Sequence, residues 1–73
     1  MMIKKRALDI KLYDWEARYV IESISKEMER LKVIAEESND EDEASDAGND
    51  YLEISGLKDR LEGLVKNTFG DHF

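Results

Sequence analysis

The chain has 73 residues, of which 40% are charged and 41% hydrophobic, and its net charge is −7. It has no cysteine, and its single histidine is His72, so disulfides, cysteine-based zinc sites and histidine-rich metal centres are excluded. A chain this short buries only about 60% of its unfolded surface, so we expect residues 1–73 to form one small domain with a marginal core of its own.

Charge is distributed unevenly along the chain. Residues 1–13 carry four basic side chains and one acidic side chain, whereas residues 36–50 carry eight acidic side chains and no basic one. Uncharged runs are too short for a transmembrane helix, and no apolar stretch of the kind found in signal peptides follows the basic N-terminus. We therefore expect a cytoplasmic protein that does not associate with membranes.

The basic segment at residues 1–13 contains a short alternation of apolar and polar side chains. Leu8, Ile10 and Leu12 are each separated by one polar residue. A period of two predicts a short strand, and within so short a chain its best pairing partner is the same strand of a second copy. The alternative is an extended or helical arm.

Residues 14–38 predict a long amphipathic helix, which in the longest interpretation continues to residue 47. Asp14 stands where an N-cap is expected, because its carboxylate can accept hydrogen bonds from the first-turn amides. Trp15 and Tyr19, four residues apart, are expected to pack in the core or as a staple at the helix start, with ligand stacking as the alternative. Apolar residues then recur at spacings of three and four, which places them on one face.

An acidic connection at residues 39–49 is expected to follow. The part from residue 41 to residue 47 is predicted either to be helical, with Gly48 as its stop, or to be a linker extended by charge repulsion. Its acids do not follow the order of a calcium-binding loop, so we expect no metal there.

A second helix is predicted at residues 50–69, since Asp50 and Glu53 have the spacing of a capping box. The alternative is a strand at residues 51–55. Gly56 and Gly63 interrupt this helix on one face, which indicates close approach by another helix. Gly70 is the expected stop, and residues 70–73 form a tail.

The predicted fold is all-α, an antiparallel hairpin of two long helices with an N-terminal strand or arm. Its two apolar stripes are too large to remain half exposed, so we expect two hairpins to dimerise into a four-helix bundle, with an unidentified partner protein as the alternative. The expected core and dimer interface consists of Ala17, Ile21, Ile24, Met28, Leu31, Ala35, Ile54, Leu57, Leu61 and Leu64.

No catalytic, cofactor or metal motif is recognisable, so we expect a non-enzymatic interaction, regulatory or structural protein. One alternative is a dimeric DNA-binding regulator, because a basic arm, a short strand and two helices follow one another as in ribbon-helix-helix repressors. The length of the helix predicted at residues 14–38 and the net negative charge of the chain argue against DNA binding. A further alternative is an acidic inhibitor or DNA mimic. The residues expected to contact nucleic acid in the DNA-binding alternative are Lys4, Lys5, Arg6 and Lys11.

Overall fold

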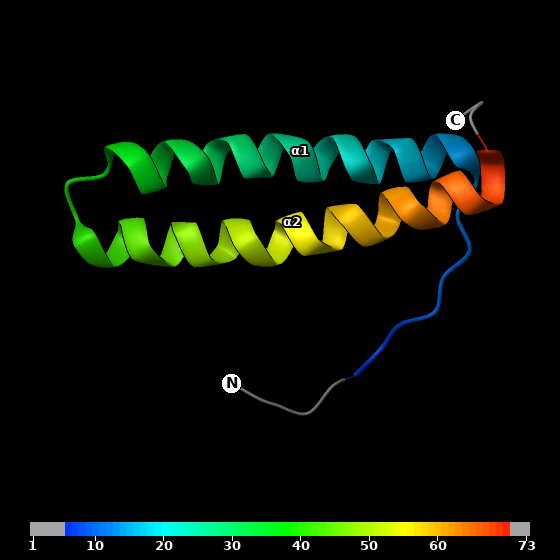
Figure 1. Cartoon of the computed structure of the whole chain (residues 1–73), viewed down its shortest axis with the longest axis horizontal. Coiled ribbons are helices and arrows are strands. Elements are labelled where there is room, and N and C mark those ends of the chain that lie inside the picture. The colour runs from blue at the N-terminus through cyan, green and yellow to red at the C-terminus, as the bar shows by residue number, and fades with distance from the viewer. Residues whose placement is uncertain (1–5, 71–73) are drawn as a thin grey trace.

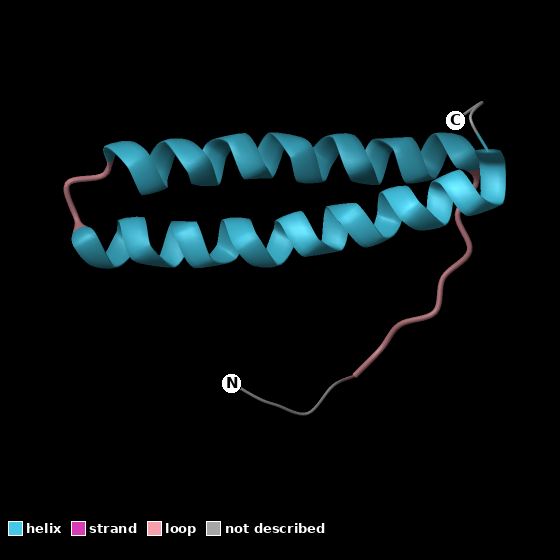
Figure 2. Cartoon of the chain, in the orientation of Figure 1, coloured by secondary structure: helices cyan, strands magenta, loops and turns pink. Residues whose placement is uncertain are grey.

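The computed structural model describes residues 6–70 and contains two helices that pack against each other as a hairpin. Helix α1 spans Asp14–Glu37 and helix α2 spans Glu41–Phe69, and Figure 1 shows them lying side by side in opposite directions. Residues 6–13 form a segment without helix or strand, as Figure 2 shows. The expectation of an all-α hairpin is confirmed for this part of the chain.

Helix α1 begins close to the predicted position, but its cap differs. The capping position is Tyr13, whose backbone N–H donates to Oε1 of Glu16 at 2.8 Å. Asp14 lies inside the first turn, where its Oδ1 accepts from the backbone N–H of Trp15 at 2.7 Å. Predicting Asp14 as the cap was therefore wrong by one residue. Both acids still lie near the positive end of the helix, where negative charge is favoured.

Of the two alternatives for residues 41–47, the helical one is confirmed, so the connection is shorter than the predicted 39–49 and only residues 38–40 separate the two helices. Asp40 caps α2, accepting from the backbone N–H groups of Asp42 at 2.9 Å and Glu43 at 3.3 Å. Ser38 braces the turn by donating its hydroxyl to Oε1 of Glu43 at 2.7 Å. Acids in a first turn are favoured by the helix dipole and supply cap acceptors, which offsets their mutual repulsion.

Helix α2 consequently begins nine residues before the predicted range of 50–69, which makes it about two and a half turns longer. Gly48 lies within it and is not a stop, and the alternative strand at residues 51–55 is also helical. The predicted end at Gly70 is confirmed. Gly70 has φ 71°, which favours glycine, and its N–H donates to the carbonyl of Lys66.

The contact between the helices is narrow. Within the described residues, the hydrophobic side chains that are buried are Ala17 and Leu31 of α1, and Ala47 and Val65 of α2. Leu31 is the most enclosed, with 4% of its surface exposed. Two of the four are alanines, which bring little apolar surface to the contact. Neither described helix has a stretch apolar and long enough to span a bilayer.

Candidate interaction surface

The stripe predicted on α1 faces α2 in the structure. Ala17 and Leu31 are buried, and the other four predicted positions are half-buried. Three-four spacing alone located this face, because a helix brings every third and fourth residue to the same side. The half-buried positions are Ile21, Ile24, Met28 and Ala35.

The stripe predicted on α2 splits into two parts. Ile54 and Leu61 are half-buried in the hairpin, whereas Leu57 is 37% exposed and Leu64 is 62% exposed. Position 58, which lies on the contact side between Ile54 and Leu61, is occupied by Lys58.

The sequence analysis missed Ala47 and placed Val65 only beside the stripe. Ala44, Ala47, Tyr51, Ile54, position 58, Leu61 and Val65 form one continuous three-four series in α2. Extending the predicted stripe of α2 towards the start of the helix, through the acidic residues, would have revealed this series.

Two exposed leucines of α2, Leu57 and Leu64, lie on one flank of the helix. This flank also carries charged residues, because Asp46, Asp50, Glu53, Leu57, Arg60 and Leu64 follow one another at intervals of three and four residues. On α1, Val20, Glu27 and Ile34 are likewise seven residues apart.

The two flanks share one side of the hairpin. Ile34 of α1 and both Asp46 and Asp50 of α2 line a single hollow beside the turn. We call this surface the apolar side. Its apolar residues are Val20, Ile24, Ile34, Leu57, Leu61 and Leu64, and the charged residues Glu27, Asp46 and Asp50 lie on the same side.

The N-terminal segment, residues 6–13, borders the apolar side at the open end of the hairpin, and we call it the arm. Leu8, Ile10 and Leu12 line a hollow together with Leu61 and Leu64 of α2, among other residues. Leu12 is half-buried, but Leu8 is 84% exposed. In Figure 1 the arm emerges from behind α2 and runs away from the hairpin. The alternating leucines and isoleucine therefore enlarge the exposed apolar surface.

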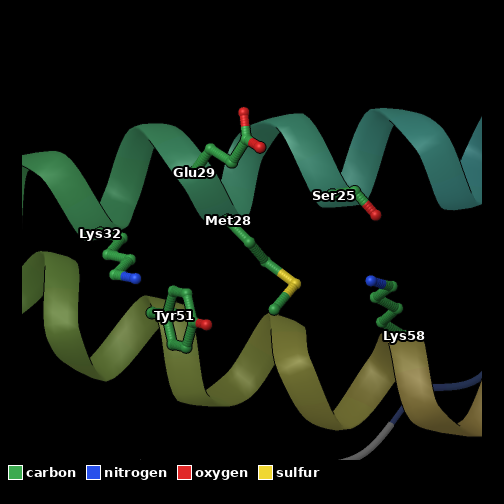
Figure 3. Close-up of a pocket in the computed structure, with 6 residues that line it drawn as sticks. All are labelled: Ser25, Met28, Glu29, Lys32, Tyr51 and Lys58. Carbon is green, nitrogen blue, oxygen red and sulfur yellow. The ribbon is translucent and has the colours of Figure 1, made fainter.

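The opposite side of the hairpin carries charged and hydroxyl-bearing side chains around its middle. Figure 3 shows Met28 reaching from α1 towards α2, with charged and hydroxyl-bearing side chains around it. Lys32 lies beside Tyr51, and Lys58 projects from α2 towards Ser25 of α1. Dehydrating two ammonium groups is costly, so this side is poorly suited to burial against a second hairpin.

One ion pair borders the apolar side. Arg30 donates from Nη2 to Oε2 of Glu27 at 2.6 Å and from Nε to Oε1 at 2.9 Å. The hydrogen bond and the positive charge of Arg30 lower the pKa of Glu27, and the same contact raises the pKa of Arg30. Both side chains are exposed, so the pair contributes little to stability by itself.

Charge is concentrated at opposite ends of the hairpin. Four acids of α2 and its cap line the hollow beside the turn, whereas Arg6 and Lys11 lie exposed on the arm. Lys4 and Lys5 lie outside the described residues. No group of three or more potential metal ligands is arranged for an ion within residues 6–70. The acids of α2 are Asp42, Glu43, Asp46 and Asp50, and the cap is Asp40.

The aromatic pair at the start of α1 is not in the core, contrary to the prediction. Trp15 and Tyr19 contact each other edge to face, with ring centroids 6.1 Å apart, and both stay more than half exposed. They lie on the face of α1 opposite the contact stripe, because they are two residues before Ala17 and Ile21.

Comparison with known proteins gives no relative: no family model, curated protein or solved structure matches the chain.

Proposed function

We propose that the chain is a non-enzymatic interaction protein of the cytoplasm, with a regulatory or structural role, that acts as a homodimer of helical hairpins. The observation that carries this proposal is the apolar side. Within the described residues the hairpin buries only Ala17, Leu31, Ala47 and Val65 among its hydrophobic side chains, whereas on the apolar side Leu64 is 62% exposed and Val20 and Leu57 are each 37% exposed. Large exposed apolar patches are typical of protein interfaces.

The size of the apolar side suits a stable dimer. Helix α1 has 24 residues, so the paired length is about 36 Å, and two helices about 10 Å apart present a width of about 20 Å. Each hairpin therefore offers about 700 Å². Two copies together would bury about 1,400 Å², which lies within the range of about 1,200–2,000 Å² for stable interfaces.

The choice between the two sides also favours a closed dimer. The apolar side is bounded by polar surface, and the opposite side carries Lys32 and Lys58. A hairpin with one interacting side forms a closed dimer, whereas a hairpin with two interacting sides would form an open polymer. Two paired hairpins form a four-helix bundle.

Light scattering across a concentration series tests this proposal. We expect the mass of a dimer. We also expect helicity to decrease as dilution dissociates the dimer, because each hairpin has little core of its own. Leu57→Asp should weaken association, while Leu52→Asp, at a position 70% exposed and outside the apolar side, should leave the dimer intact. A monomer at every concentration would refute the homodimer.

A second candidate is DNA binding through the arm, favoured by the exposure of Arg6 and Lys11 on an extended segment. Such binding would be strongly salt-dependent, because it releases counterions from the phosphates. Retention on heparin that is lost in Arg6→Ala/Lys11→Ala would support it. Absence of retention at low salt would exclude it.

A further inference from the structure

We infer that the two hairpins lie antiparallel, so that the basic arm of each copy contacts the acidic turn end of the other. This arrangement rests on the proposed homodimer and specifies its geometry. The partner is a second copy of this chain, and its recognition combines an apolar contact with opposite charges.

The charges of one chain cannot neutralise each other across the hairpin. Lys11 lies two residues before Tyr13, at the open end, whereas Asp46 and Asp50 lie near the turn. The 24 residues of α1 separate these ends by about 36 Å. This distance is several times the Debye length of about 10 Å at 0.1 M salt. Neither Arg6 nor Lys11 forms an ion pair with any residue in the described range.

Orientation decides whether these charges attract or repel in a dimer. In a parallel dimer the two turn ends meet, so Asp46 and Asp50 of each copy would face their own counterparts across the interface. In an antiparallel dimer each turn end meets the open end of the other copy, where Lys11 lies. Like charges brought together at an interface oppose association, and opposite charges fix the register.

The apolar surfaces point to the same orientation. At the open end, the arm and α2 line a hollow that contains Ile10 and Leu64, with Asp9 as its one charged residue. At the turn end, Ile34 lines a hollow together with five acids and Arg30. Antiparallel pairing places Ile34 of one copy over the open-end hollow of the other copy. The same pairing covers the exposed arm.

Distances between two labels test the orientation directly. The chain has no cysteine, so Asn39→Cys at the turn and Asn67→Cys near the open end each provide one attachment point. Both positions are exposed and polar, away from the apolar side. Spin labels on these variants report intermolecular distances by pulsed dipolar spectroscopy.

An antiparallel dimer predicts long distances, about 36 Å or more, within pure Asn39→Cys and within pure Asn67→Cys dimers. Mixing the two variants should add a short distance, below about 25 Å, between Asn39→Cys of one copy and Asn67→Cys of the other. Short distances in the pure dimers would overturn the arrangement while leaving the homodimer intact. A monomer at every concentration would overturn both.

Charge reversal tests the contact itself. Asp46→Lys/Asp50→Lys should weaken the dimer about tenfold or more at low salt, and adding Lys11→Glu should recover part of the loss. Asp59→Lys/Glu62→Lys makes the same charge change away from the apolar side and serves as the control. Equal dissociation constants for the two double variants would overturn the contact.

Discussion

Leu31→Ala should remove a large share of the stability of the hairpin. Leu31 has 4% of its surface exposed and is the only large aliphatic side chain besides Val65 that is buried within the described residues. Replacing a buried leucine by alanine costs about 2–5 kcal/mol, from lost transfer free energy and the cavity left behind. A domain of this length has a free energy of unfolding of roughly 4–11 kcal/mol, so the substitution removes at least about a fifth of it.

Urea unfolding followed by circular dichroism measures this loss. With a slope of about 1–2 kcal/mol per molar urea for a small protein, the midpoint should fall by about 1–5 M. Wild type and variant must be compared at equal concentration, because dimerisation contributes to apparent stability. Leu52→Ala is the matched control, since Leu52 is 70% exposed. If Leu31→Ala lowers the midpoint no more than Leu52→Ala, the packing of the two helices described above is refuted.

Four further substitutions test the helices and their charges. Gly56→Ala and Gly63→Ala should each raise the free energy of unfolding by about 1 kcal/mol, because an added Cβ meets no atom within 4 Å. A lower free energy of unfolding, measured with urea, would instead indicate close approach by another helix. Asp40→Ala should lower the free energy of unfolding by about 1 kcal/mol through loss of the cap, with Asp40→Asn largely restoring it, and identical melting of all three proteins would contradict the cap. Glu27→Gln should melt below wild type at neutral pH. Since the folded pKa of Glu27 lies below its ordinary 4.5, this difference is present above pH 4.5 and disappears as the pH falls through the lowered value; a difference that stays constant down to pH 2 would contradict the Arg30 contact.

Local rules predicted much of this fold. The three-four rhythm located the contact face of α1, since burial of one face imposes that period whatever the partner. Gly70 ended α2 as expected, because a helix terminus needs only local backbone geometry. The start of α2 was missed for the opposite reason: the acids were weighed as repelling charges, while Asp40 acts as a cap and the following acids favour the first turn.

The sequence by itself determined two amphipathic helices in a hairpin, because periodicity and end signals act within a few residues. Only the tertiary structure decided which apolar residues the hairpin uses. Ala47 and Val65 meet α1, while Leu57 and Leu64 remain on the apolar side. The rotation of α2 about its axis depends on the whole interface, so no local pattern specifies it. That rotation is what leaves an apolar surface exposed between a basic arm and an acidic turn.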